Sequence, residues 1–150
     1  MKRSGLLFIS IGVIVILSSI TLFFITRSPG GTSTDHFQKG EAPFAQQKWD
    51  EAIEEYTKAI ALDRRFISAY RRRAEAYRNK GDIDAAIFNY KKIIELDPEN
   101  IDNCFQLASL YSSRGDNYSA IAALIKAMEI DPNYMDPMTQ FVPIRVFIKN

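Results

Sequence analysis

The side chains best suited to chemistry in this protein are basic ones that gather between residues 64 and 80. Six arginines and one lysine face a single acid, Glu75, in this stretch, so its net charge is +6. Guanidinium groups pair bidentately with carboxylates and phosphates, which predicts a site for an acidic peptide, the C-terminus of a partner protein or lipid headgroups. A solvated face with local ion pairs is the alternative, because Glu75 stands three or four residues from Arg71, Arg72 and Arg78. The basic residues are Arg64, Arg65, Arg71, Arg72, Arg73, Arg78 and Lys80.

Side chains that commonly carry out catalysis or bind metals are scarce. The sequence has one histidine, His36, and one cysteine, Cys104, far apart from each other. A nucleophile needs a base within hydrogen-bond reach, and a zinc site needs three or four ligands. We therefore expect no enzyme activity, no metal and no cofactor. We expect His36 to be solvent-exposed or to pack against a neighbour, and Cys104 to lie on a helix-packing face.

The elements that must position these residues follow from a phrase that recurs three times along the sequence. Its period of about 34 residues is typical of helical units that stack into a solenoid and bind partners along its surface. The second and third copies end in Asp-Pro at 97–98 and 131–132, where proline cannot continue the preceding helix. The residues in register are Ala52, Ala86 and Ala120; Ile53, Ile87 and Ile121; and Lys58, Lys92 and Lys126.

Each phrase is preceded by a second helical stretch, which is clearest in the middle copy. Tyr70, Ala74 and Tyr77 are spaced i, i+4, i+7 and share one helical face. Gly81-Asp82 and Gly115-Asp116 lie between the paired stretches, where glycine permits a tight turn and aspartate caps the next helix. The sequence therefore predicts two helices per copy and an all-α protein.

This layout resembles the tetratricopeptide repeat family. The resemblance implies three helix-turn-helix units, at 33–66, 67–100 and 101–134, that form a short right-handed solenoid. The first unit departs most, because Pro43 stands where an aromatic residue is usual and Arg64 replaces the closing proline. We expect its first helix to be kinked, or to begin near Ala42 with the proline in its first turn. The matching residues are Gly40, Trp49, Ala52, Tyr56 and Ala59 in the first unit, and Tyr70, Ala74, Tyr77, Gly81, Ala86, Tyr90 and Pro98 in the second.

The resemblance also implies a peptide-binding groove, because the first helix of each unit lines the concave surface in this family. Its residues here would be Arg71, Arg72, Glu75 and Arg78, with Phe37, Phe105 and Gln106 beside them. Alternatively, the phenylalanine side chains pack between helices instead of lining the groove. Some family members bind acidic chaperone C-termini through a clamp of lysines, asparagines and an arginine. We do not expect that activity, because the matching positions retain one basic residue: they hold Phe37, Glu41, Arg72, Asp102 and Gln106.

Residues 1–27 predict a membrane anchor. Leu6 to Ile25 carry no charge across 20 residues, and at about 1.5 Å per residue such a helix spans roughly 30 Å, the thickness of the hydrocarbon core. A cleaved signal peptide is the alternative. Its apolar core usually has about 7–15 residues and ends at small side chains, whereas this run ends in Phe23, Phe24 and Ile25.

Charges beside this run predict its orientation. Lys2 and Arg3 precede it and Arg27 alone follows closely, so the positive-inside rule places the N-terminus in the cytoplasm and the repeats across the membrane. A bacterial inner membrane facing the periplasm is the expectation, with a thylakoid membrane or a cytosol-facing organelle outer membrane as alternatives. Within the anchor, the seven-residue spacing of Gly5, Gly12 and Ser19 predicts a packing stripe for another membrane helix, with ordinary membrane-helix composition as the alternative.

Two segments flank the units. Residues 28–35, SPGGTSTD, are expected to form a short flexible linker that overlaps the start of the first unit. In residues 135–150, Pro137 and Pro143 forbid one long helix. The apolar residues between Phe141 and Ile148 predict a cap over the final helix, with docking on a partner or in the protein's own groove as the alternative.

Charge and layout together predict the function. Outside residues 1–27, 16 basic and 18 acidic residues remain, a net charge of −2, so we expect no nucleic-acid partner. We expect a membrane-anchored scaffold or adaptor that binds protein partners, for example through an acidic segment, and that contacts the bilayer through residues 6–25. Such a protein would support assembly of a membrane-associated complex. The alternative is an accessory or regulatory subunit of a membrane enzyme complex, held mainly through its transmembrane helix.

Overall fold

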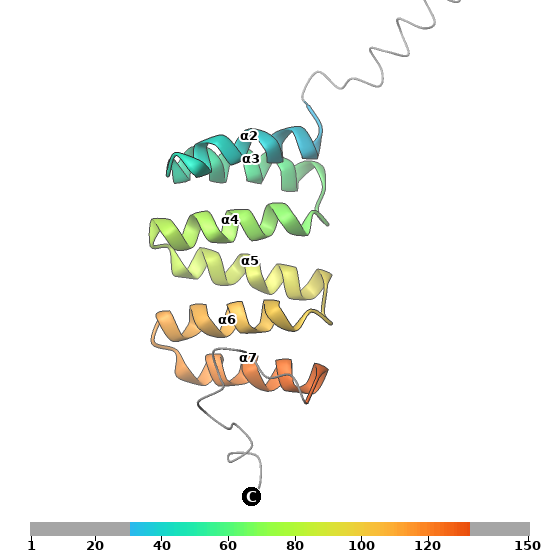
Figure 1. The fold of residues 1–150 in the computed structure, drawn as a ribbon, viewed down its shortest axis with the longest axis vertical. Coiled ribbons are helices and arrows are strands. Elements are labelled where there is room, and N and C mark those ends of the chain that lie inside the picture. The colour runs from blue at the N-terminus through green and yellow to red at the C-terminus, as the bar shows by residue number, and fades with distance from the viewer. Residues whose placement is uncertain (1–30, 133–150) are drawn as a thin grey trace, which may run out of the picture.

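The computed structural model describes residues 31–132, and this part of the protein is a stack of six α-helices. Figure 1 shows the helices lying side by side in sequence order, from α2 at one end to α7 at the other. Each helix packs against the next one in the sequence, so the six form three successive pairs. The prediction of an all-helical repeat protein is confirmed. The helices are α2 (Ser33–Ala45), α3 (Trp49–Leu62), α4 (Ile67–Lys80), α5 (Ile83–Leu96), α6 (Ile101–Ser113) and α7 (Asn117–Ile130).

The turns within the second and third pairs follow the expected glycine-aspartate chemistry. Gly81 and Gly115 adopt left-handed backbone conformations, with φ of +92° and +82°, which a side chain would strain. The carboxylates of Asp82 and Asp116 then accept hydrogen bonds at 3.0 Å from the backbone N–H of Ala85 and Ser119. Each aspartate thereby caps the following helix, as predicted.

The turn of the first pair departs from this chemistry. Gln47 stands in register with Gly81 and adopts a φ of +60°, although its side chain disfavours that conformation. Lys48 stands in register with Asp82, and its side chain makes no capping hydrogen bond to α3. The first pair therefore has the same backbone turn without the two residues that stabilise it elsewhere.

Helix α2 begins at Ser33 rather than near Ala42, so the second of the two alternatives expected for this helix is wrong. Thr32 caps the helix: its hydroxyl accepts a bond from the Asp35 N–H at 3.1 Å, and the Asp35 carboxylate accepts one from the Thr32 N–H at 2.8 Å. Residues 33–35, which the expected linker shares with the first unit, form the first turn of this helix. Pro43 lies in the last turn.

Small residues let the helices of each pair approach closely. Ala52, Ala86 and Ala120 are all buried. Gly40 packs directly on Tyr56 from the facing helix, and a Cβ atom built on this glycine would lie 2.5 Å from Cε1 of the tyrosine ring. Because Tyr56 is fully buried, its ring has no room to move away.

Several predictions fall outside the described residues. These are the anchor at Leu6–Ile25, its stripe of Gly5, Gly12 and Ser19, most of the linker, and the C-terminal segment 135–150. Within residues 31–132, no helix has the length and apolar character needed to span a bilayer.

Candidate functional site

A groove of about 850 Å³ runs between α4 and α6 and reaches α5 and α7. Five residues from the predicted site line it: Arg71, Glu75, Arg78, Phe105 and Gln106. The first helices of the second and third units thus bring together side chains that the whole of α5 separates in the sequence. The other lining residues are Tyr90, Asn100, Asp102, Asn103, Ala108, Ser109, Ser112, Ala120 and Leu124.

Two arginines line this groove without an ion pair in the part of the chain that the structure describes. Within residues 31–132, neither Arg71 nor Arg78 forms an ion pair. Glu75, the acid within reach of both in the sequence, pairs instead with Arg72, at 3.0 Å. Arg71 makes one long hydrogen bond, in which its Nη2 donates to Oδ1 of Asn103 at 3.4 Å. Both guanidinium groups therefore keep donors for a ligand.

Asn103 is a buried polar residue of this groove that sequence analysis missed. It is 2% exposed, and its Nδ2 is the buried side-chain polar atom without a hydrogen-bond partner in the described part of the protein. An unpaired buried donor costs about 1–3 kcal/mol. The repeat register held a signal, because Asn103 occupies the position of Ala69, which is fully buried in the second unit. A polar side chain at a repeat position that holds a small apolar residue in the preceding unit was thus the signal in the sequence that could have identified Asn103.

Arg72 lies outside the lining of the groove, contrary to the prediction. Its guanidinium pairs with Glu41 at 3.1 Å and with Glu75 at 3.0 Å, and it lies over the Phe44 ring at 5.1 Å from the centroid. Glu41 also accepts a hydrogen bond from the Tyr56 hydroxyl at 2.6 Å. Burial and this bond raise the pKa of Tyr56. The network ties α2 and α3 to α4, so Arg72 joins neighbouring units.

Phe37 also lies outside the groove lining. Its ring packs between Tyr56 and Phe66, with centroid separations of 5.7 Å and 5.1 Å. These are ordinary distances for aromatic packing in a core. Phe37 therefore follows the alternative considered for the phenylalanines, packing between helices.

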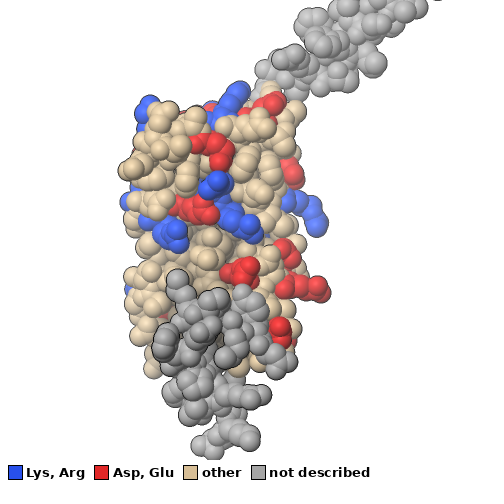
Figure 2. Space-filling view, viewed as in Figure 1, with Lys and Arg blue, Asp and Glu red and all other residues tan. Residues whose placement is uncertain are grey.

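The predicted basic cluster does not form one surface. Arg73 points to the other side of α4, where it donates to Asn89 Oδ1 at 2.9 Å and to Thr57 Oγ1 at 3.1 Å. Lys80 pairs with Asp50. Figure 2 shows basic and acidic side chains next to one another on the face in view. The +6 stretch is thus divided, because consecutive helical residues point in different directions.

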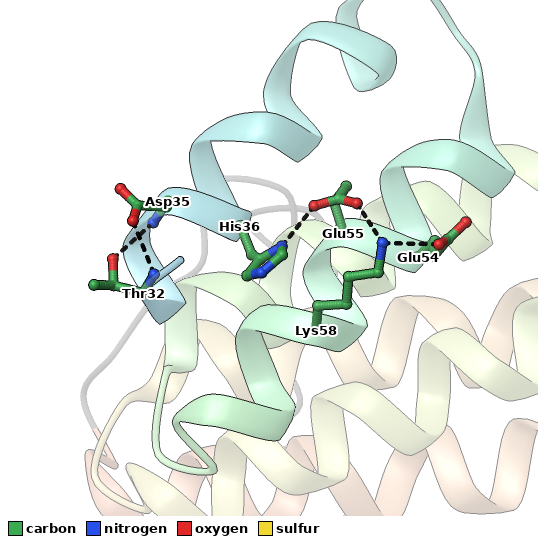
Figure 3. A network of polar contacts seen from close by, with 6 residues as sticks. All are labelled: Thr32, Asp35, His36, Glu54, Glu55 and Lys58. Atoms are coloured by element: carbon green, nitrogen blue, oxygen red, sulfur yellow. Dashed lines mark hydrogen bonds and ion pairs between the residues drawn. The ribbon is translucent and has the colours of Figure 1, made fainter. Parts of the chain in front are cut away.

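His36 and Cys104 lie on different helices, α2 and α6. Figure 3 shows the His36 ring directed at Glu55 of α3, with 2.7 Å between Nδ1 and Oε2. Cys104 is fully buried, and burial raises the pKa of its thiol. His36 packs against a neighbour and Cys104 faces the helix interface, as expected. In residues 31–132, no three histidine, cysteine, aspartate or glutamate side chains gather as a metal site.

Comparison with protein families gave three matches that together span residues 40–134. A family described as "TPR repeat" matches residues 40–79. Two described as "Tetratricopeptide repeat" match residues 67–100 and 101–134. The last two matches have the bounds predicted for the second and third units. No curated protein matches the sequence.

Solved structures share the fold. A crystal structure of MamA is 26% identical with a TM-score of 0.64, and the alignment covers 69% of this chain and 60% of MamA. The first TPR of Spaghetti (RPAP3), bound to the HSP90 peptide SRMEEVD, is 22% identical with a TM-score of 0.60 and coverages of 69% and 82%. YrrB, described as a TPR protein with an unusual peptide-binding site, is 20% identical with a TM-score of 0.61 and coverages of 70% and 54%.

Proposed function

Because this chain belongs to the tetratricopeptide repeat family, we propose that it is an adaptor that binds an extended, acidic segment of a protein partner in the groove between α4 and α6. One observation carries the proposal: three side chains that line the groove have donors to spare. They are Arg71 and Arg78, which lack ion pairs within residues 31–132, and Asn103, whose Nδ2 is buried without a partner.

The chemistry of these donors defines the ligand. Asn103 Nδ2 donates to a backbone carbonyl or carboxylate of the bound segment, and the arginines pair with its acidic side chains. Arg71 and Arg78 are seven residues apart on one helix, a rise of about 10.5 Å. A polyproline II segment rises about 3.1 Å per residue and returns to the same side every three residues, so this rise matches two acids about three residues apart that face the same helix. The half-buried Leu124 beside them supplies apolar contact area.

The relatives support peptide binding in general but not this particular ligand. The RPAP3 domain is bound to a chaperone peptide, and YrrB is described by its peptide-binding site. In this protein, Glu41 stands at a clamp position and already binds Tyr56 and Arg72. An acidic chaperone tail held by the usual clamp is therefore not the ligand that we propose.

In-cell crosslinking with mass spectrometry of the full-length protein tests this function. The test variant is Arg71→Glu with Arg78→Glu. The matched control is Arg64→Glu with Arg65→Glu, which makes the same change of charge in the exposed turn between α3 and α4. Loss of a partner in the test variant alone supports binding in the groove. Retention of every partner in both variants contradicts it.

We also propose that the protein is anchored in a membrane and supports assembly of a complex there. The uncharged run Leu6–Ile25 supports this proposal, and Lys2 and Arg3 favour a cytoplasmic N-terminus with the repeats on the other side, as in a bacterial inner membrane facing the periplasm. Protease treatment of intact spheroplasts tests it. Digestion of the repeats from outside supports the orientation, and protection until the membrane is permeabilised contradicts it.

A further inference from the structure

The outer side of α7 carries an exposed apolar face, here called the α7 face, made of Tyr118, Ile121 and Ile125. These residues are 90%, 55% and 43% exposed. Their spacing of three and four residues places them on one side of the helix. Large apolar residues that gather in this way mark an interaction surface.

The repeat register shows what kind of surface this is. Ile121 is in register with Ile87 of α5, which is only 4% exposed because α6 packs on α5. The α7 face is therefore the side on which the first helix of a following unit would lie. Tyr118 and Ile125 extend this face with apolar side chains where α5 carries the polar residues Asp84 and Lys91.

A repeated ion pair identifies the occupant. Asp50 pairs with Lys80, and Asp84 pairs with Arg114 at 2.6 Å; each pair joins residues 30 positions apart across two neighbouring units. One period later the same two positions hold Tyr118 and Ile148. Both members of the charged pair are thus replaced by aromatic or aliphatic residues, so an apolar contact takes the place of the ion pair.

We propose that the protein's own segment 133–150 covers the α7 face, with Ile148 against Tyr118. This segment begins two residues after Asp131, and six of its last ten residues are valine, isoleucine or phenylalanine. The nine residues from Asn133 to Phe141 reach about 30 Å when extended. Helix α7 has 14 residues and is about 21 Å long, so the segment can return along all of it. The tether gives an effective concentration of about millimolar, which favours it over a free partner.

Disulfide trapping in the full-length protein tests this contact. The variant combines Tyr118→Cys with Ile148→Cys, and the control combines Leu62→Cys with Ile148→Cys. Leu62 is also exposed, at 58%, but it lies on α3, two units away. Cys104 does not interfere, because it is fully buried. We expect a disulfide within one molecule in the Tyr118 variant, formed at least tenfold faster than in the control and at a rate independent of protein concentration.

The other outcomes overturn the proposal in distinguishable ways. A disulfide between two molecules, formed faster at higher protein concentration, would assign the face to a second copy. Equal trapping in both variants, or none in either, would leave the face open to a partner. A second readout is maleimide labelling of Ile125→Cys. Adding Ile148→Asp should speed this labelling at least fivefold, and an unchanged rate contradicts the contact.

Discussion

Replacing Asn103 with alanine should make the protein more stable and less able to bind its partner. The change removes a buried donor without a hydrogen-bond partner, which costs about 1–3 kcal/mol in the native protein. Alanine also favours a helix by about 0.5 kcal/mol more than asparagine, and Ala69 already occupies the same register position with no exposed surface. The lost packing and the 3.4 Å contact with Arg71 offset about 1 kcal/mol of this gain. The free energy of unfolding should therefore rise by about 1 kcal/mol.

Asn89 provides a matched control of the same residue type, because it is 1% exposed and both of its side-chain polar atoms form hydrogen bonds. Its Nδ2 donates to the Ala85 carbonyl at 2.8 Å, and its Oδ1 accepts from Arg73 Nε at 2.9 Å. Asn89→Ala leaves the half-buried Arg73 with one donor unpaired. It should lower the free energy of unfolding by about 1–3 kcal/mol.

Thermal unfolding followed by circular dichroism distinguishes the two variants. A rise of about 1 kcal/mol corresponds to a Tm increase of roughly 4–8 °C for a domain of this size. Asn103→Ala should show this increase and bind the partner at least tenfold more weakly, while Asn89→Ala should melt at a lower temperature. Equal destabilisation by both substitutions would refute the reasoning, because it would mean that the Asn103 amide serves the fold rather than a ligand.

Three further predictions concern the first pair of helices. Gln47→Gly with Lys48→Asp supplies the missing turn residues and should raise the free energy of unfolding by about 1–2 kcal/mol; an unchanged urea midpoint contradicts this. Gly40→Ala places a Cβ against the buried Tyr56 ring and should lower the free energy of unfolding by about 1–3 kcal/mol. An unchanged urea midpoint would contradict this, because it would mean that the helix interface can accommodate the extra methyl group. The bonds from Lys58 and His36 lower the pKa of Glu55, so its stabilisation is present above its unfolded pKa and fades as the pH falls below about 4. In Glu55→Gln, the melting temperature should therefore fall less steeply with decreasing pH than in the unaltered protein. An unchanged dependence of the melting temperature on pH would contradict this role of Glu55.

The fold was predictable because its determinants are local. The alanine register, the Gly-Asp turns and the Asp-Pro ends each act within a few residues and recur in the sequence. The start of helix α2 was the exception, because it was not predicted correctly. Its start depends on Thr32 and Asp35, and this capping box lies within a stretch of small polar residues that suggested a linker.

The site was only partly predictable because it depends on which acid each arginine meets. The sequence places Arg71, Arg72 and Arg78 within reach of Glu75, but it cannot show that Glu41, from the preceding unit, joins Glu75 around Arg72. That long-range pair holds Arg72 outside the groove lining, while Arg71 and Arg78 form no ion pair within residues 31–132. The Asn103 amide likewise becomes conspicuous only when its burial and lack of a partner are known.

The most direct test of the groove is fluorescence anisotropy with labelled ten-residue peptides that carry two glutamates one to five positions apart, and glutamine versions of each. We predict that the peptide whose glutamates are about three positions apart binds most tightly, and that its glutamine version binds at least tenfold more weakly. The Arg71→Glu with Arg78→Glu variant should lose a similar amount of affinity for the glutamate peptide, whereas the Arg64→Glu with Arg65→Glu variant should not. Equal loss in both double variants, or binding that ignores the spacing of the acids, would contradict a groove that reads carboxylates through Arg71 and Arg78.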